Sequence, residues 1–275
     1  MKIIRYLDSA GRAHHGSEQP DGSALRIEGD IFGSHRVTTE RADLRKLLAP
    51  VVPAQILCIG LNYRQHAEET KAKIPERPIL FVKGINTLAH PGDPILIPQH
   101  LRSNEVDYEC ELAVVIGKGG RDITQADAWN HVFGITAGQD ISDRAVQMAS
   151  KPPHFDLGKS FDTFGPIGPV VVSPDALPNR DVISIKCLVN GEERQNDTSA
   201  NLIFGIPFLI EYLSHITTLQ TGDVIFTGTP AGVGMMQKKL LRDGDTVTTI
   251  VEGVGTMVNA CKRIADHNLP LKKKG

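Results

Sequence analysis

Several features that mark particular classes of protein are missing from this sequence. Its four cysteines are widely spaced and form no CxxC pair, so we expect buried reduced thiols and neither a disulfide framework nor a zinc site. It has no apolar run of about 18 residues and no apolar signal segment at its start, which predicts a soluble, cytoplasmic protein without a membrane partner.

Strong charge is missing as well. The formal net charge is -2, and no basic cluster is interleaved with aromatic residues, so we expect no nucleic-acid partner. The basic run Lys272-Lys273-Lys274 is expected to be a solvated tail. Composition therefore leaves a protein of ordinary globular type.

Strand signals outnumber helix signals in the rest of the chain. Residues 1–50 predict a small β-rich N-terminal domain and residues 51–275 the main domain, with Pro50 and Pro53 at the boundary. Asn190-Gly191 predicts a β-hairpin. Three further turns each lead into an apolar strand: Pro91-Gly92-Asp93, Thr221-Gly222-Asp223 and Asp243-Gly244-Asp245. Since strands do not alternate with helices, we expect a mainly β (α+β) fold of mixed, mostly antiparallel sheets.

Few helices are expected. Helical patterns cover residues 41–48, 63–70, 124–131 and 201–216. Asn62 is expected to cap the second of these helices. His14 and His15 have no acid close by in sequence, and we expect them to lie in a loop.

A strand-like run over residues 107–117 carries the most informative pair of residues. Because side chains alternate along a strand, Glu109 and Glu111 share one face. Such a pair is either a solvent-facing acidic surface or one wall of a cation site. Asp140 could supply a third carboxylate, and three acids with open positions suit Mg²⁺ or Mn²⁺. Alternatively, Asp140 or Ser142 is the N-cap of a helix that runs to Gln147.

Proton chemistry is indicated by a second pair. His66 and Glu69 stand three residues apart on a predicted helix, so they share a face and can form a carboxylate-imidazole pair. The alternative is an exposed helix with two ordinary polar residues. The neighbouring Glu68 should contribute nothing in either case.

Anion contacts are indicated by two lysines and a glycine-rich turn. Lys83 and Lys159 lie in apolar surroundings, where an ammonium group either meets an acid or reaches out to solvent. In the stretch 226–234 the glycines permit close approach of a ligand, and Thr229 offers a hydroxyl and an N–H to an anionic group. The stretch lacks a Walker ending, which disfavours nucleotide binding, and a purely structural turn is the alternative.

Taken in order, these motifs resemble the fumarylacetoacetate hydrolase family. The matching segments are 58–63 with His66 and Glu69, 78–83, 107–117, 138–147, 158–169 and 222–234. The resemblance implies a roll of mixed β-sheets and a homodimer, with a Mg²⁺ or Mn²⁺ ion as cofactor. It implies metal ligands at Glu109, Glu111 and Asp140, a water-activating dyad of His66 and Glu69, and a substrate site lined by Lys83, Gln147, Lys159 and Thr229.

The chain departs from the family pattern at two places. The family often has an acid at the position of Ala145, whereas this chain has its second acid at Asp143, which puts the partner of Arg144 in doubt. Gly84 stands where a proline commonly follows the lysine, which could change the loop from Gly84 to His90.

The resemblance implies a metal-dependent hydrolase that cleaves a C–C bond in a 2,4-dioxo acid, such as an acylpyruvate, a fumarylpyruvate-like acid or a sugar-derived diketo acid. Glu69 would orient His66, which takes a proton from the attacking water, while Lys159 and Gln147 stabilise the oxyanion or hold the substrate. A lyase that decarboxylates a β-keto acid such as oxaloacetate is the first alternative, since the same residues permit it. A non-catalytic metal or small-molecule binding protein is the second.

Overall fold

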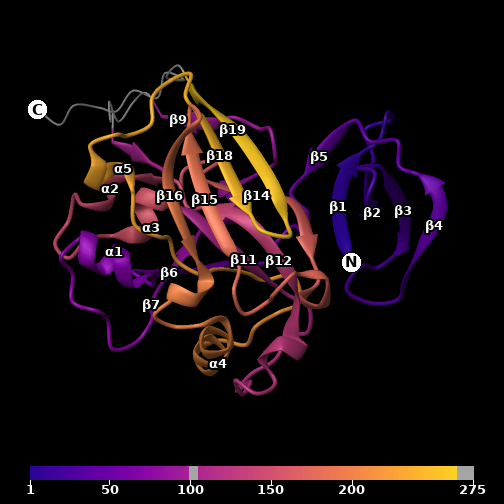
Figure 1. Cartoon of the computed structure of the whole chain (residues 1–275), viewed down its shortest axis with the longest axis horizontal. Coiled ribbons are helices and arrows are strands. Elements are labelled where there is room, and N and C mark those ends of the chain that lie inside the picture. The colour runs from indigo at the N-terminus through magenta and orange to yellow at the C-terminus, as the bar shows by residue number, and fades with distance from the viewer. Residues whose placement is uncertain (99–104, 265–275) are drawn as a thin grey trace, which may run out of the picture.

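Two stacked β-sheets form the framework of the protein in this computed structural model, which describes residues 1–98 and 105–264 (Figure 1). The predicted tail Lys272–Lys274 lies outside the described residues. Ten strands of the larger, 12-stranded sheet run in the order β4 (His35–Arg41), β3 (Ala24–Gly29), β2 (Ala13–Glu18), β1 (Lys2–Leu7), β14 (Gly165–Val172), β12 (Val132–Gln139), β11 (Cys110–Ile116), β17 (Val224–Phe226), β6 (Ile56–Gly60) and β7 (Ile79–Lys83). Its remaining strands are β5 (Lys46–Leu48), paired with β1, and β8 (Leu88–Ala89), paired with β14.

The second sheet has five strands and lies over the middle of the first (Figure 1). Its order is β16 (Glu192–Thr198), β15 (Ser184–Val189), β18 (Thr246–Val251), β19 (Gly255–Arg263) and β9 (Ile95–Ile97). A separate short pair joins β10 (Val106–Asp107) and β13 (Ser142–Asp143). The α-helices are α1 (Arg64–Glu69), α2 (Arg144–Gln147), α3 (Phe155–Lys159), α4 (Ile206–Ile216) and α5 (Gly234–Gln237), and the 3-10 helices are η1 (Ile85–Thr87), η2 (Ala128–His131), η3 (Pro174–Ala176) and η4 (Ser199–Asn201).

The prediction of a mainly β fold with mostly antiparallel sheets is confirmed. Among the described strands, parallel pairing is confined to β6 with β17, β8 with β14, and β9 with β19. The predicted hairpin is confirmed too, because β15 and β16 pair antiparallel around Asn190 and Gly191. Both turn residues have positive φ angles, 53° and 81°, which a two-residue type I′ turn requires.

Strand β11 is buried on both faces, which explains its continuous apolar sequence. Cys110, Leu112 and Val114 contribute to the hydrophobic cluster between the two sheets. Ala113 and Val115 contribute to a separate cluster on the opposite face. The predicted period of two is therefore confirmed along this strand.

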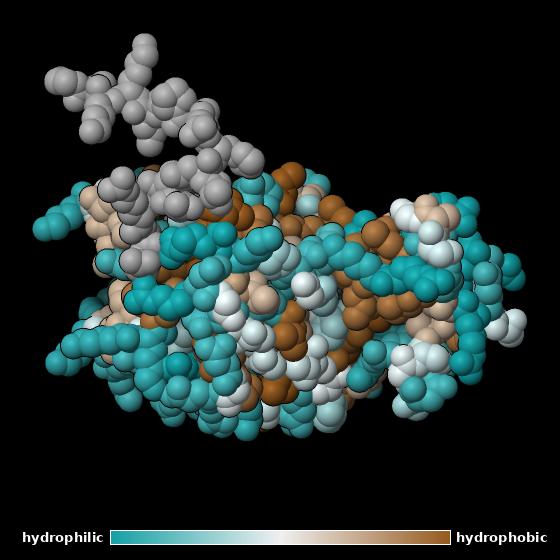
Figure 2. Space-filling model, turned by 90° about the horizontal axis from the view of Figure 1, so that it is seen from above, coloured by the Kyte–Doolittle hydropathy of each residue, from teal (hydrophilic) through white to brown (hydrophobic). Residues whose placement is uncertain are grey.

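The N-terminal strands continue the larger sheet at one end of the molecule (Figure 1). The junction is an antiparallel pairing in which Ile3 of β1 faces Val171 of β14. Hydrophobic residues gather on the surface between these strands and the rest of the molecule (Figure 2). A second connection is the Ala49 N–H, which donates to Nδ1 of His90 at 3.0 Å.

Two local predictions were wrong because distant partners outweigh local preference. Residues 41–48 form no helix, since Lys46–Leu48 pairs as β5 with β1. Asn62 does not cap α1, where Tyr63 holds the N-cap position. Instead its side-chain amide bonds to the backbone of Phe204 and Thr227.

Three other predictions need correction. The helix expected over 124–131 is a 3-10 turn limited to Ala128–His131. The helix expected over 201–216 begins at Ile206, after Gly205. His14 and His15 both lie in β2 rather than in a loop, and Nε2 of His14 is 2.9 Å from the Asp8 carboxylate.

The cysteines and the lengths of the helices were also subjects of prediction. All four cysteines are buried and free. None of the described helices is long and apolar enough to span a membrane.

Candidate metal and catalytic site

Three acids from two neighbouring strands meet inside the protein. Glu111 lies in β11, Glu109 directly before it, and Asp140 directly after β12, which pairs with β11. Each offers a carboxylate oxygen, and these oxygens all lie within 4.8 Å of one another. Their exposed fractions are 7%, 1% and 0% for Glu109, Glu111 and Asp140, so the pair of glutamates is not a solvent-facing surface.

Three cations surround these acids. Nζ of Lys159 lies 2.8 Å from Oε2 of Glu109 and 2.6 Å from Oδ2 of Asp140. Nζ of Lys83 lies 2.6 Å from Oδ1 of Asp140 and also donates to the backbone carbonyl of Lys159. Nη2 of Arg144 lies 2.5 Å from Oε1 of Glu109. Both lysines are therefore buried against acids and do not extend to solvent.

The two glutamates differ in their electrostatics. Burial would raise the pKa of Glu109, but Lys159 and Arg144 outweigh burial and hold this pKa well below its ordinary value. Burial and the nearby Asp140 and Glu109 carboxylates instead raise the pKa of Glu111. Glu111 thus lies where negative charge is in excess.

The donor set fits a hard divalent cation. The three clustered carboxylates offer only oxygen ligands. Hard cations such as Mg²⁺ and Mn²⁺ prefer oxygen ligands, whereas soft metals prefer sulfur. Among the described residues of the centre, four buried carboxylates meet three buried cationic side chains, so a bound cation would offset an excess of negative charge. The carboxylates are Asp107, Glu109, Glu111 and Asp140, and the cations are Lys83, Arg144 and Lys159.

Asp107 and its contact with Arg144 were missed by sequence reasoning. The Asp107 carboxylate is fully buried and accepts hydrogen bonds from Nε of Arg144 at 2.9 Å and from the backbone N–H groups of Gly234 and Met235. Nη1 of Arg144 donates to Oε1 of Gln147 at 2.9 Å. Asp107 therefore connects the start of α5 to the arginine beside the candidate metal ligands. Its position at the end of a predicted strand was the available signal.

The displaced acid has a local role. Asp143 is the N-cap of α2 and accepts the N–H of Val146 at 3.1 Å, so neither Asp140 nor Ser142 caps this helix. Arg144 finds its acidic partners in Asp107 and Glu109 instead.

His66 and Glu69 form the predicted pair on α1. Nδ1 of His66 lies 3.2 Å from Oε2 of Glu69, and their side chains are 11% and 21% exposed. The Glu69 carboxylate also accepts the N–H of Gly232. The carboxylate favours the imidazole tautomer with its proton on Nδ1, which leaves Nε2 as a base. Glu68 is exposed.

The glycine-rich loop after β17 binds anionic groups of the protein itself. Its N–H groups donate to Glu111 from Gly228 at 2.6 Å, to Glu69 from Gly232 at 3.0 Å and to Asp107 from Gly234 at 2.7 Å. Gly228 has a φ angle of 102°, and a Cβ there would lie 2.6 Å from the Cβ of Asn62. One loop therefore positions a candidate ligand, the dyad acid and the partner of Arg144.

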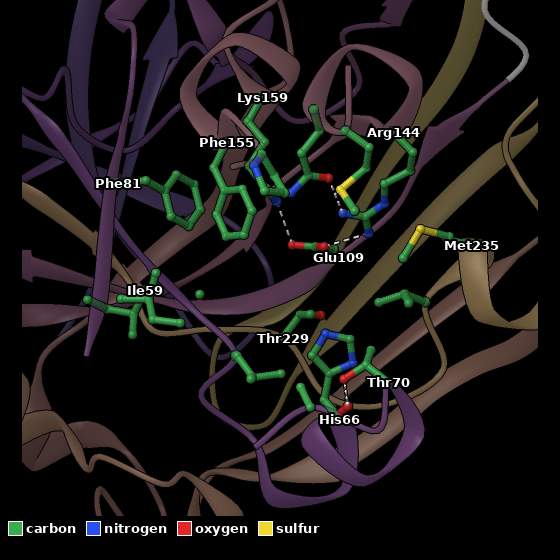
Figure 3. Close-up of a pocket in the computed structure, with 18 of the residues that line it drawn as sticks. Ile59, His66, Thr70, Phe81, Glu109, Arg144, Phe155, Lys159, Thr229 and Met235 are labelled. Carbon is green, nitrogen blue, oxygen red and sulfur yellow. Dashed lines mark hydrogen bonds and ion pairs between the residues drawn. The ribbon is translucent and has the colours of Figure 1, made fainter. Parts of the chain in front are cut away.

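A cavity of about 380 Å³ lies between His66 and the cluster of acids and cations. His66 lies on one side of it, facing Glu109, with Lys159 and Arg144 on the far side (Figure 3). Gln147 and Thr229 also line it, whereas Lys83 is buried behind Asp140. Much of the remaining wall is apolar: Ile59, Leu61, Ile79, Phe81, Met148, Phe155, Val233, Met235 and Met236.

Comparison with known proteins gives consistent matches. The family model described as fumarylacetoacetate (FAA) hydrolase C-terminal matches residues 55–262. A "fumarylacetoacetate hydrolase domain-containing protein 2 homolog" of Dictyostelium discoideum is 44% identical over 230 residues, which are 79% of this chain and 74% of the relative. An oxaloacetate tautomerase of Bacillus subtilis is 44% identical over 220 residues, 78% of this chain and 72% of that protein.

A solved structure extends the match to nearly the whole fold. The crystal structure of a 5-carboxymethyl-2-hydroxymuconate delta-isomerase from Mycobacterium smegmatis has a TM-score of 0.84 and 33% sequence identity, and covers 96% of this chain and 100% of that one.

Proposed function

This chain belongs to the fumarylacetoacetate hydrolase family, and from that premise we propose that it is a Mg²⁺- or Mn²⁺-dependent enzyme that moves a proton within a β-keto 2-oxo acid, oxaloacetate being the favoured substrate. The observation that carries the proposal is a cavity lined by Glu109 and Glu111 of the buried carboxylate triad and by His66, whose partner is Glu69. The tautomerase named among the relatives and the isomerase among the solved structures support proton transfer over hydrolysis as the reaction.

Glu109, Glu111 and Asp140 would hold the metal ion, which when bound supplies a Lewis acid that polarises the 2-oxo group. The cationic side of the cavity would orient the substrate. Arg144 and Lys159 provide positive charge for carboxylate groups, and Gln147 provides an amide whose oxygen already accepts a hydrogen bond from Arg144.

His66 is the base in this proposal. With its Nδ1 proton directed to Glu69, Nε2 takes a proton from C3 of the keto acid. The His66 imidazolium then returns this proton to the oxygen on C2, which gives the enol. Lys159, whose ammonium group donates to Glu109, Asp140 and Ser142, keeps positive charge on the other side of the cavity (Figure 3). The apolar wall that includes Phe81 and Phe155 would limit the access of water to the bound substrate.

Hydrolysis of an acylpyruvate and decarboxylation of oxaloacetate use the same groups in other ways. Hydrolysis needs His66 to activate a water that attacks a distal carbonyl, and decarboxylation replaces loss of the C3 proton with loss of CO₂. The oxaloacetate named for the relatives favours decarboxylation over acylpyruvate hydrolysis as the second candidate.

The test offers oxaloacetate and acetylpyruvate to the Mg²⁺-loaded protein and to His66→Ala. We expect the wild type to bring the enol and keto forms of oxaloacetate to equilibrium faster than the uncatalysed reaction does. The rate with His66→Ala should be at least about 100-fold lower than with the wild type, as expected on loss of a general base. CO₂ release from oxaloacetate would instead indicate the lyase, and acetate with pyruvate from acetylpyruvate the hydrolase. Turnover of neither substrate, with Mg²⁺ bound, would return the binding-protein alternative.

We also propose that the protein acts as a homodimer. Val82, Ile85 and Leu157 are exposed hydrophobic residues on or next to the edge strand β7 and on α3, where a second copy would cover them. Light scattering should give a mass of twice the 29.9 kDa chain, and a monomer would contradict the proposal.

A further inference from the structure

The backbone that carries the candidate metal ligands lacks a strand neighbour at one point. Strand β11 pairs with β17 at Ala113, Val114 and Val115, but this pairing ends there. Cys110, between the two glutamates, has its N–H and C=O directed away from β12, on the side that β17 no longer covers. Buried backbone groups of this kind need other partners.

Side chains supply them. The Cys110 N–H donates to Oε1 of Gln195 at 2.9 Å, Nε2 of Gln195 donates to Oγ1 of Thr229 at 2.8 Å, and that hydroxyl donates to the Cys110 carbonyl at 3.0 Å. These three hydrogen bonds close a ring that engages both backbone groups of Cys110. All three residues are buried, at 0%, 1% and 4% exposure for Cys110, Gln195 and Thr229.

We infer that Gln195 is a positioning residue for the metal ligands and for Thr229. It comes from β16, delivered by the Asn190-Gly191 hairpin, and its remaining contact is the Pro230 carbonyl, which Nε2 meets at 2.9 Å. By holding Cys110 it fixes the backbone between Glu109 and Glu111, so the carboxylates keep their spacing. The inference rests on the proposed metal site and adds a residue to it.

The ring also determines what Thr229 can offer to a substrate. Its single hydroxyl proton is donated to Cys110, and one oxygen lone pair receives the Gln195 amide. The oxygen can therefore only accept a further hydrogen bond from the cavity that it lines. It suits a hydroxyl group, such as that of an enol, and not a carboxylate, in contrast to the sequence expectation for this side chain.

The test measures Mn²⁺ affinity by the electron paramagnetic resonance signal of free Mn²⁺, together with kcat and KM. Gln195→Met keeps the length of the side chain and removes its hydrogen bonds. We expect its Mn²⁺ Kd to rise about tenfold or more, as for other residues that orient metal ligands. Thr229→Val should raise both the Kd and KM, and Thr229→Ser, which keeps the hydroxyl, should restore them.

Asn259→Leu is the matched control. Asn259 is 1% exposed, and its amide likewise holds backbone carbonyls, those of His90 and Asp93, away from the cavity lining. Its loss should lower Tm without changing the Mn²⁺ Kd.

An unchanged Kd and KM in Gln195→Met, or an equal change in Asn259→Leu, would overturn the positioning role while leaving the metal site in place. If Gln195→Met does not fold, the Mn²⁺ Kd values of Thr229→Val and Thr229→Ser provide the test. Equal Kd values in these two variants would overturn the positioning role. A wild type that binds no Mn²⁺ would overturn the proposed function and this inference together.

Discussion

Glu68 and Glu69 are adjacent acids whose surroundings differ sharply. Glu69 contacts His66 and Gly232, whereas Glu68 is exposed. Glu69→Gln keeps an oxygen for the Gly232 N–H and removes the charge that orients His66. We expect kcat to fall about 100-fold, within the range for general-base catalysis, with an unchanged Mn²⁺ Kd.

Glu68→Gln is the control for this change and should match the wild type in kcat and KM. Steady-state rates with oxaloacetate provide the measurement. Equal losses in the two variants, or none in Glu69→Gln, would show that the pair on α1 takes no part in proton transfer.

At the residue scale, the sequence predicts residues whose partners are implied by local spacing. Glu109 with Glu111 follows from the period of a strand, and His66 with Glu69 from the period of a helix. Asp107 and Gln195 act through contacts with residues distant in the sequence: Asp107 with Arg144 and Gly234, and Gln195 with Cys110. No local period encodes such contacts, so only the folded chain reveals them.

The hairpin β15–β16 is the element that carries Gln195, and its turn depends on Gly191. This glycine has a φ angle of 81°, and a Cβ there would meet no atom within 4 Å, so a side chain would add backbone strain alone. We expect Gly191→Ala to lower the free energy of unfolding by about 1 kcal/mol, as for a non-glycine residue in the left-handed region. Gly191→Asn should lose less, because asparagine tolerates this region.

Urea unfolding of the two variants checks this prediction. Equal stability of wild type, Gly191→Ala and Gly191→Asn would contradict the strain argument. A loss well above about 3 kcal/mol in Gly191→Ala would also contradict it, since backbone strain at one residue is smaller.

At the scale of elements, turns were predictable and some helices were not. Gly92, Gly222 and Gly244 all have positive φ angles, a local requirement that glycine meets directly. The apolar spacing of Leu44, Leu47 and Leu48 fits a helix as well as it fits a strand, but residues 46–48 form strand β5, which pairs with β1. Hydrophobic spacing cannot decide between a short helix and a strand when the partner strand is 40 residues away.

The N-terminal strands and the rest of the molecule are joined by a contact that depends on protonation. Nδ1 of His90 accepts the Ala49 N–H, so the imidazole must be neutral there. Burial lowers the pKa of His90; the Asp93 carboxylate raises it, and Lys46 and Arg5 lower it further. The folded state therefore binds this proton less readily than the unfolded state.

Stability from this contact should be complete above about pH 6.5, the ordinary pKa of histidine, and fall as the pH drops below it. Urea unfolding at pH 7.5 and 5.5 gives the measurement. His90→Asn, whose side-chain oxygen can accept a hydrogen bond without titrating, should reduce the difference between the two pH values. The same difference in both proteins would rule out His90 as its source.

At the scale of the whole molecule, the order of strands was beyond sequence reasoning. The motifs predicted the class of fold, but not that β1 pairs with β14, about 170 residues later, as well as with β2, or that β6 pairs with β17 as well as with β7. Strand order depends on which apolar faces bury one another, and several strands of similar composition satisfy that condition equally.

The glycine-rich loop after β17 has a consequence for the chain during its synthesis. Glu111, Glu69 and Asp107 all precede this loop by more than 100 residues, yet each takes a hydrogen bond from it. A ribosome-bound chain that ends before Gly228 has these three acids but not the backbone N–H groups that hold them in place. We therefore expect the candidate metal and catalytic site to reach its folded arrangement late in translation, after these acids have left the exit tunnel.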